Sequence, residues 1–385
     1  MEMRVATIRK RTLPSGKVVW LASYTDGGGA RRFKQFPTKR GADAFLTQAK
    51  SQVAAGVHTP DSVSPTVAEA AEIWLKRCER DKLERTTIEQ YRGHVELHIA
   101  PRIGAVKLSR LTAPLVNEFV DQLLVAGRSR ELCRRVLISL SSIVTEAQRR
   151  GLVTVNNVRS AKPVKRSSRE NTRPLMPTKA ELKALIDITP ERSRPMLLTL
   201  LFAGLRGSEM RGLLWEDVDL KRGVLHVRRR VDRFNAFGPP KSKAGIRDIP
   251  LPPTLLRELK AWRLACPNGP LGLVFPTTTG TVQGHANILH RFFWPLQVEA
   301  GITVLKDGKD EQGRATKVSA AKYGLHALRH AAAALWIEQG LNPKRIQTLM
   351  GHASIQQTMD RYGYLFEAQE DEAAMLAGVE AGLLS

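Results

Sequence analysis

Two spacings of hydrophobic residues occur along the chain, and they predict strands near the N-terminus followed by helices. The runs RVATIRKR, VVWLASYT and RRFKQFP are rich in β-forming residues, and the turn signals PSGK and DGGGA separate them. The next run, TKRGADAFLTQAKSQVAAG, has the spacing of an amphipathic helix. Residues 1–60 are therefore predicted to form a small β-sheet with one helix.

Residues 66–160 repeat the helical spacing four times. Apolar positions recur at helical intervals in VAEAAEIWLKRC, TTIEQYRGHVELHI, LVNEFVDQLLVAG and ELCRRVLISLSSIVTEAQRRG. The polar, proline-containing stretch 58–65 precedes them, and the basic, Ser-rich and Pro-rich stretch 160–177 follows. The pattern predicts an all-helical domain with a linker at each end.

The remaining residues, 175–385, predict a mainly helical domain with a small antiparallel sheet. Two helices are expected to meet at 204–207, and helices resume at His326. Between them, GVLHVRRRVDRF and AGIRDIPLP have strand composition and flank the hairpin GPPKSK. Residues 303–322 lack a core pattern and are expected to form a surface loop or hairpin. The chain as a whole is predicted to be an α+β protein of several domains.

An excess of basic residues indicates a polyanionic partner. Sixty Lys and Arg residues oppose 37 Asp and Glu residues, which gives a formal charge of +23. Such an excess favours nucleic acid through counterion release. Residues 363–385 differ, because they contain five acids, no base and the apolar run AAMLAGVEAGLL. This tail is expected to pack on protein, either in a partner subunit or within its own chain.

Cysteine usage and hydropathy argue against several classes of protein. The three cysteines lie far apart and outside any CxxC pattern, so neither a disulfide framework nor a thiolate metal site is expected. The start of the chain lacks the apolar core of a signal peptide, and the longest strongly apolar stretch, 195–205, is too short to cross a membrane. We expect a cytoplasmic protein with no membrane partner.

The C-terminal part contains a phenol and several cationic side chains in separate short motifs. They are Arg206 in GLRGSE, Lys243 in the hairpin, His326 and Arg329 in HALRH, His352 in LMGHAS, and Tyr362 in DRYGY. Guanidinium groups bind phosphate oxygens in a bidentate fork. A phenol, with an ordinary pKa of about 10, must be activated by a base or by cations before it attacks. The combination indicates covalent transfer of a DNA strand to tyrosine.

Each cationic residue has an expected role in that reaction. Arg206 and Arg329 are expected to clamp the charge that develops on the phosphate oxygens, and His352 is expected to add a hydrogen bond. Lys243 is expected to protonate the leaving 5′ oxygen, and His326 to assist proton movement at the phenol. Arginines replace a metal ion in this scheme, so neither a metal nor a cofactor is expected.

Other basic residues are candidates for DNA contact. Three lie in the third predicted strand, five in the helical domain and one in the hairpin: Arg31, Arg32, Lys34, Lys82, Arg85, Arg130, Arg134, Arg135 and Lys241. A β-ribbon or a basic helix face can contact DNA in a groove. A solvated charged face is the alternative interpretation for the strand and for the helices.

These motifs resemble those of the tyrosine recombinases, the phage integrase family, over about residues 66–366. The family's GLRxSE, HxLRH and GH boxes and its nucleophile fall in order on the candidates above, and its hairpin lysine maps to Lys243 through KSKAGIRDIPL. Glu209 and Asp217 match acids that brace the family's site. Two departures are Ala331, where Thr is common, and Tyr364, where His is frequent, which makes Tyr364 an alternative nucleophile.

The resemblance implies a site-specific integrase of a bacterial host, acting at the nucleoid, that integrates or excises a mobile element through a 3′-phosphotyrosyl intermediate. It implies an arm-type DNA-binding domain at 1–60, a core-site DNA-binding domain at 66–160 and a catalytic domain with its tail at 175–385. It also implies double-stranded attachment sites and a homotetramer whose tails pack in trans. An excision factor and a host DNA-bending protein are the further partners that it suggests.

Three other functions are alternatives. A chromosome or plasmid dimer resolvase of the same family would carry the same motifs, but the additional N-terminal domain favours an integrase. A metal-dependent nuclease or transposase needs several converging carboxylates, whereas the pairs His326 with His330 and His94 with His98 lack a convincing third ligand. A DNA-binding regulator without chemistry does not explain why every catalytic position is filled.

Overall fold

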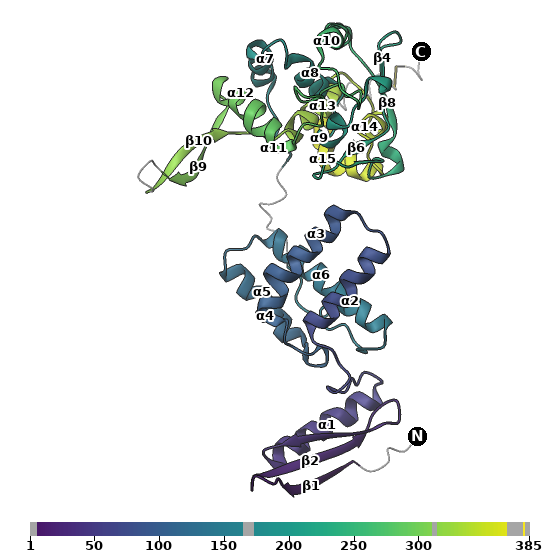
Figure 1. Ribbon diagram of the computed structural model, residues 1–385, viewed down its shortest axis with the longest axis vertical. Coiled ribbons are helices and arrows are strands. Elements are labelled where there is room, and N and C mark those ends of the chain that lie inside the picture. Colours follow the sequence, from purple (N-terminus) through teal and green to yellow (C-terminus); the bar gives the residue numbers. More distant parts are fainter. Residues whose placement is uncertain (1–5, 165–172, 310–313, 368–379, 382–385) are drawn as a thin grey trace. The chain divides into compact units, whose positions relative to one another are not determined.

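The computed structural model describes residues 6–164, 173–309, 314–367 and 380–381 (Figure 1). Internal contacts divide the chain into two compact units, residues 1–171 and 172–385. The predicted linker at 160–177 includes the boundary between these units. Each unit has hydrophobic clusters of its own, two in the first and two in the second, among the described residues.

The first unit begins with a three-stranded antiparallel sheet and one helix. The strands β1 (Thr7–Thr12), β2 (Val18–Thr25) and β3 (Arg31–Phe36) are hydrogen-bonded in that order. The helix α1 (Lys39–Ala54) begins where the side chain of Thr38 accepts a hydrogen bond from a first-turn amide. The sheet and the helix share a core of Ala22, Tyr24, Ala42, Leu46 and Ala49. The prediction for this segment is confirmed.

A helical bundle follows in the same unit. Its elements are α2 (Val67–Arg80), α3 (Arg85–His94), the π-helical turn η1 (Val95–Ile99), α4 (Ala100–Ile103), the 3-10 turn η2 (Leu108–Arg110), α5 (Ala113–Val125) and α6 (Arg130–Arg149). A reciprocal capping box between Thr66 and Glu69 fixes the start of α2. Trp74, Phe119 and Leu140 are buried in a core that the sheet does not share.

The second unit is mainly helical. Its helices are α7 (Lys179–Ile188), α8 (Arg194–Phe202), α9 (Gly207–Arg211), α10 (Pro253–Ala265), α11 (His285–Ile288), the π-helical turn η6 (Leu289–Phe293), α12 (Trp294–Glu299), α13 (His326–Glu338), α14 (Pro343–Met350) and α15 (Ile355–Glu367). No helix in the described part of the chain is both long enough and apolar enough to cross a membrane.

Short antiparallel strands complete the second unit. A three-stranded sheet has the order β4 (Val218–Asp219), β5 (Val224–Val227) and β8 (Arg247–Pro250), and two pairs join β6 (Arg230–Val231) to β7 (Phe237–Gly238) and β9 (Thr303–Lys309) to β10 (Ala315–Ala321). The last pair is the hairpin that projects beside α12 in Figure 1. It occupies the segment that lacks a core pattern.

Close packing at Gly204 brings the GLRGSE turn onto α13. Gly204 has a φ of +56°, and a Cβ at this position would lie 2.8 Å from the ring of Trp336 and 3.3 Å from the Cβ of Ala332. Glycine is therefore required by both the backbone conformation and the space. The turn lies between α8 and α9, as the sequence predicted for 204–207.

Asp61 joins the sheet to the helical bundle within the first unit. Its carboxylate binds the Lys34 ammonium at 2.7 Å, the Arg110 guanidinium at 2.6 Å and the Ser109 hydroxyl at 2.7 Å. Burial raises the pKa of Asp61, but the hydrogen bonds from Arg110 and Lys34 outweigh burial and hold this pKa well below its ordinary range. The carboxylate is therefore charged at all but strongly acidic pH.

Asp61→Asn should lower the free energy of unfolding by about 1 kcal/mol at pH 7. A carboxyl with a depressed folded-state pKa contributes its full stabilisation above its unfolded pKa of about 3.9, and that contribution declines as the pH falls from there to the folded value, below which it is lost. The difference between wild type and variant, measured by urea unfolding, should therefore be smaller at pH 3 than at pH 7. Asp43→Asn, at an exposed position on α1, is the control. An equal difference at both pH values would contradict the pairing.

Candidate active site

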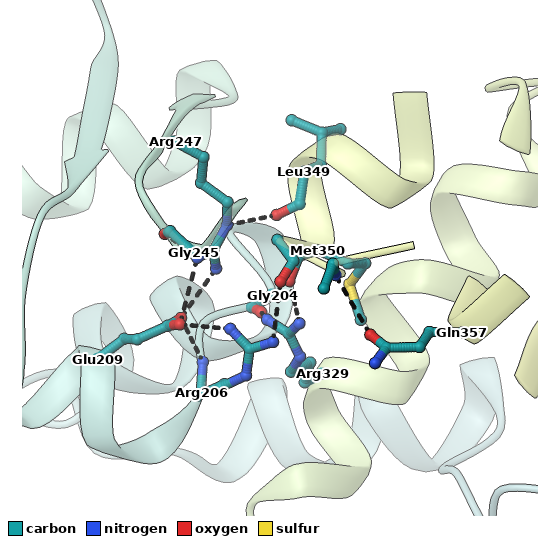
Figure 2. Close-up of polar contacts among 11 residues, drawn as sticks. Gly204, Arg206, Glu209, Gly245, Arg247, Arg329, Leu349, Met350 and Gln357 are labelled. Carbon is teal, nitrogen blue, oxygen red and sulfur yellow. Dashed lines mark hydrogen bonds and ion pairs between the residues drawn. The ribbon is translucent and has the colours of Figure 1, made fainter. Parts of the chain in front are cut away.

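The predicted catalytic residues come from five segments of the second unit. Arg206 precedes α9, Lys243 begins the 3-10 turn η5 (Lys243–Gly245) before β8, and Arg329 lies in the first turn of α13. His352 follows the end of α14, and Tyr362 lies in α15. Figure 2 shows polar contacts between these segments.

Glu209 is the buried anion at the centre. Its Oε1 accepts a hydrogen bond from Nη1 of Arg206 at 2.6 Å, and its Oε2 accepts one from Nη2 of Arg247 at 2.8 Å (Figure 2). Burial raises the pKa of Glu209, but the charges of Arg247, Arg206 and Arg329 outweigh burial and lower this pKa to about 2. Glu209 therefore remains ionised at neutral pH and balances part of the surrounding positive charge.

Arg247 is a buried partner that the sequence analysis did not single out. Its Nε donates to the carbonyl of Leu349 at 2.7 Å, and its Nη1 donates to the carbonyl of Gly245 at 2.9 Å. One guanidinium thus ties the turn that carries Lys243 to the end of α14 and to Glu209. Arg247 and Ile249 are the inward positions of β8. An inward arginine in a strand signals a buried acidic partner, and this signal was present in KSKAGIRDIPL.

Gly351 permits that close approach. It ends α14 in the left-handed conformation, with a φ of +60°. A Cβ would lie 2.9 Å from the carbonyl oxygen of Ala244 and 3.1 Å from Nη1 of Arg247. Its own carbonyl accepts a hydrogen bond from Nη2 of Arg206 at 3.1 Å. The glycine of the GH box therefore places the lysine turn, Arg206 and His352 next to one another.

Arg329 lies buried at the bottom of the site, where it binds two backbone carbonyl groups. Only 1% of its surface is exposed. Its Nη1 donates to the carbonyl of Gly204 at 2.6 Å, and its Nη2 donates to the carbonyl of Met350 (Figure 2). Burial and the charge of Arg206 lower its pKa to about 9, so it is still a cation at neutral pH. Arg206, by contrast, has a side chain that is 32% exposed and can reach an incoming phosphate.

Tyr362 is completely buried, and its hydroxyl meets a histidine that was not among the predicted catalytic residues. The phenolic oxygen lies 2.7 Å from Nδ1 of His330. Burial raises the pKa of Tyr362 to about 12, although Arg329 and Arg361 oppose this shift. The phenol is therefore protonated at neutral pH. Tyr364, the alternative nucleophile, is half-buried instead, and the Arg173 guanidinium lies 4.4 Å from the centre of its ring.

His352 and His326 are neutral at physiological pH. Burial and the charge of Arg329 lower the pKa of His352 to about 3. Its ring stacks on Tyr362, and its Nδ1 lies 2.9 Å from the Thr358 hydroxyl. When Thr358 donates to Nδ1, Nε2 carries the hydrogen; this buried nitrogen has no hydrogen-bond partner in the described part of the chain. A neutral His352 can thus donate one hydrogen bond to an incoming oxygen.

His326 lies beside His330 and not on the phenol. The two rings are perpendicular, in an edge-to-face arrangement with centres 4.7 Å apart. Although part of His326 is open to solvent, desolvation by its surroundings and the charge of Arg329 lower its pKa to about 4.

Lys243 and Lys241 are both exposed on the segment between β7 and β8.

Asp217 pairs with a different arginine from those that bind Glu209. It is buried in the 3-10 turn η4 (Trp215–Asp217), where its carboxylate is 3.4 Å from the Arg229 guanidinium. Burial raises its pKa.

No group of His, Cys, Asp or Glu side chains in the described ranges is arranged to hold a metal ion.

The three basic residues of β3 divide between the two faces of the sheet. Arg32 and Lys34 pair across the strands with Tyr24 and Ala22 and share the helix side of the sheet with them. Arg32 also binds Asp26 at 2.7 Å. Arg31 lies on the opposite, open face, where its guanidinium is 5.6 Å from the ring centre of Phe33.

The candidates in the helical bundle lie at helix starts and in one turn. Arg130, Lys82 and Arg85 are exposed, and Lys82 adopts a φ of +52° in the turn before α3. Arg134 and Arg135 both bind Glu131, at 2.9 and 3.1 Å. Hydrogen bonds from these two arginines lower the pKa of Glu131 to about 2. The positive charge of Arg134 and Arg135 at the start of α6 is therefore partly neutralised by Glu131.

Family models match most of the second unit and part of the bundle. The phage integrase family matches residues 177–368, and the phage integrase N-terminal SAM-like domain matches residues 66–124. The chain is a tyrosine recombinase, an enzyme of site-specific DNA recombination. It belongs to the phage integrase family. The resemblance of its sequence motifs to that family is thereby confirmed.

Two relatives illustrate the range of similarity. The prophage integrase IntR of Escherichia coli (strain K12) is 28% identical over 255 residues, which cover 64% of this chain and 60% of IntR. A XerC-like tyrosine recombinase of Caldanaerobacter subterraneus is 23% identical over 393 residues, which cover 93% of this chain and 95% of that protein. The chain therefore spans less than two thirds of the length of IntR and nearly all of the XerC-like protein.

Two solved structures share the fold. The Tn1549 transposon integrase in complex with a circular intermediate DNA has a TM-score of 0.65 at 17% identity, covering 84% of this chain and all of that chain. A lambda integrase tetramer bound to a Holliday junction has a TM-score of 0.57 at 18% identity, covering 88% and 92%. The predicted α+β class, with an N-terminal sheet, helical domains and small antiparallel sheets, is confirmed.

Arg247→Met should lower the free energy of unfolding of the chain by about 3 kcal/mol, because it leaves Glu209 buried with less compensating charge. Adding Glu209→Gln should recover part of this loss, since the double variant buries no surplus anion. Urea unfolding of the two single variants and the double variant measures this coupling. Arg222→Met, at an exposed position, is the control. Strict additivity of the two losses would contradict the ion pair.

Proposed function

We propose that the chain integrates and excises a mobile DNA element, with Tyr362 as the nucleophile that forms a 3′-phosphotyrosyl ester. The observation that supports this most strongly is the packing of Tyr362 against His330 and His352, with Arg329 close enough to oppose the rise in its pKa. A phosphodiester that reached this cluster would meet a nucleophile and fixed positive charge together.

Arg206 and Arg329 divide the work on the phosphate in this proposal. Arg206 is partly exposed, and Glu209 and the Gly351 carbonyl fix its orientation. It is the guanidinium that can contact non-bridging oxygens directly. Arg329 supplies charge from beneath, because two of its nitrogens already bind carbonyl groups. His352 adds a hydrogen bond from Nε2 as charge develops in the transition state.

Lys243 protonates the leaving 5′ oxygen in this proposal. Its turn is tied to the site by Arg247, while its own side chain is exposed and free to follow DNA. The free 5′ hydroxyl of a second strand can then attack the phosphotyrosine and restore a phosphodiester. No external energy source is needed, because the ester bond is conserved.

DNA binding is proposed for all three predicted domains. Residues 1–60 would bind arm-type sites, residues 66–160 the core site, and residues 175–385 the cleaved phosphate. The separate cores of the sheet and the bundle support treating them as two domains, although Asp61 connects them. Arg31 on the open sheet face is better placed for DNA than Arg32 or Lys34, which are paired with acids.

A homotetramer on double-stranded attachment sites is proposed as the working assembly. The lambda integrase tetramer on a Holliday junction supports it by analogy of fold. The acidic tail would pack on a neighbouring subunit; residues 368–379 and 382–385 lie outside the described residues. An excision factor and a host DNA-bending protein complete the proposal, within the cytoplasm and nucleoid of a bacterial host.

Dimer resolution is the second candidate function, because the XerC-like recombinase aligns over nearly the whole chain. The N-terminal sheet, with Arg31 beside the exposed Phe33, favours integration, since a second DNA-binding domain can engage a second class of site. Recombination between an arm-bearing site and a core site, compared with two core sites, separates the two functions.

Tyr362→Phe should bind DNA normally and form no covalent adduct, because it lacks only the phenolic oxygen. Tyr364→Phe should form the adduct at nearly the wild-type rate. The measurement is a nicked suicide substrate incubated in EDTA, followed by denaturing gel electrophoresis and peptide mapping. An adduct in Tyr362→Phe that disappears in Tyr364→Phe would transfer the role to Tyr364. Cleavage without any adduct would instead indicate a nuclease.

Lys243→Ala should slow cleavage of ordinary DNA by about 10²-fold or more, as expected for loss of a general acid. A substrate with sulfur in place of the bridging 5′ oxygen should be cleaved at the wild-type rate, because a thiolate leaves without a proton. Lys241→Ala, two residues earlier on the same exposed segment, is the matched control. Rescue by sulfur in the Lys241 variant alone would assign the acid to Lys241.

A further inference from the structure

His330 occupies a position that the expected mechanism does not use. It lies one turn after His326 on α13, half-buried, and its Nδ1 is 2.7 Å from the phenolic oxygen of Tyr362. The two rings meet at 61° with centres 5.8 Å apart. His326, the residue expected to move the phenolic proton, instead packs against the His330 ring in an edge-to-face contact. The hydrogen bond therefore joins α13 to the nucleophile through His330.

The surroundings of His330 keep it neutral. Burial lowers its pKa to about 4, and His326, Arg361 and Arg329 act in the same direction. These groups, with the phenol of Tyr362, are the titratable and charged groups that face it from α13 and α15. Since the phenol is protonated, it donates to Nδ1, and the hydrogen of the neutral ring is on Nε2. The Nδ1 lone pair of His330 thus already accepts a hydrogen bond from the proton that must leave.

We propose that His330 is the catalytic base that accepts the phenolic proton of Tyr362 during DNA cleavage, a role that rests on the proposed recombinase function. The phenolic oxygen forms a bond to phosphorus, and its proton moves to Nδ1. The bond between phosphorus and the 5′ oxygen breaks, and that oxygen takes a proton from Lys243. Cleavage thus leaves the phenolic proton on His330 and the Lys243 proton on the 5′ oxygen.

The large difference between the pKa of Tyr362 and the pKa of His330 explains how the site stays inactive without DNA. With the phenol near 12 and the imidazole near 4, the proton remains on Tyr362 in the free protein. As the new bond to phosphorus forms, the phenolic oxygen loses its basicity, and the adjacent phosphate anion favours an imidazolium. Proton transfer is therefore coupled to bond formation.

The same assignment explains religation. The imidazolium formed in cleavage lies beside the phenolic oxygen, which must be protonated when the 5′ hydroxyl of a strand displaces it. An imidazolium with a low pKa is a strong proton donor to this leaving group. By microscopic reversibility, loss of His330 should slow cleavage and religation by the same factor. The same symmetry holds for any residue that acts only on the transition state, so the pH profile must distinguish proton transfer from positioning.

Two substitutions separate proton transfer from positioning. His330→Ala removes the ring, and His330→Asn keeps a polar group near the position of Nδ1 that cannot accept a proton at neutral pH. Single-turnover cleavage of a suicide substrate by full-length protein should be about 10²-fold to 10³-fold slower in both variants. Wild-type cleavage should change little between pH 6 and 8. The variants should gain about tenfold per pH unit, because their phenol must ionise into solvent.

Recovery of the wild-type rate and pH profile in His330→Asn would overturn the proposal, because a hydrogen bond alone would then suffice. A variant pH profile parallel to that of wild type would overturn it as well. DNA affinity of both variants should match wild type, and both should stay folded at the assay temperature, although His330→Ala should melt earlier because the buried phenol loses its hydrogen-bond partner. His290→Asn, an exposed histidine on η6, should cleave at the wild-type rate and controls for the substitution itself.

The outcome is distinguishable from failure of the proposed function. If Tyr362→Phe still forms an adduct, Tyr362 is not the nucleophile. The proposed function then fails, and the role of His330 as its base fails with it. If Tyr362→Phe forms none and His330→Asn cleaves normally, the recombinase function holds and the base lies elsewhere. His326→Asn, tested in parallel, should show a smaller loss than His330→Asn; the reverse order would return the base to His326.

Discussion

The buried carboxylate of Glu209 is the interaction on which the site depends. It binds two guanidinium groups directly and opposes the charge of a third, so a single anion allows Arg206, Arg247 and Arg329 to converge in a protein interior. Three cations against one anion leave an excess of positive charge. A buried ion cluster contributes little to net stability because of its desolvation cost. The ion cluster instead supplies an excess of positive charge that a phosphodiester anion can neutralise.

Backbone groups fix this charge in place. The carbonyls of Gly204, Met350, Leu349 and Gly351 each accept a hydrogen bond from one of the three arginines. These carbonyls belong to the turn before α9 and to the end of α14, and the left-handed Gly351 brings the latter within reach. The arginines are therefore oriented before any ligand arrives. Such preorganisation is the condition under which fixed charge stabilises a transition state effectively.

Short motifs in the sequence predicted which segments meet, but not every contact between them. Arg206, Arg329, His352 and Tyr362 were expected in one site, and the structure brings them together. Arg247 was missed because it serves as a contact between distant elements, and His330 because its partner on α15 depends on how two helices pack. In β3, both alternating faces contain a phenylalanine and a basic residue, so periodicity did not indicate which side α1 would cover.

The three histidines of the site share a low pKa, which follows in part from the nearby arginines. Burial and the nearby guanidinium charges lower the pKa of His326, His330 and His352 to about 4, 4 and 3. None of them therefore changes charge between pH 6 and 8. The positive charge of the site is supplied by arginine over this range, while the imidazoles provide lone pairs and N–H groups. A phosphate would thus meet a constant field, and proton movement would be confined to the groups that touch the reacting oxygens.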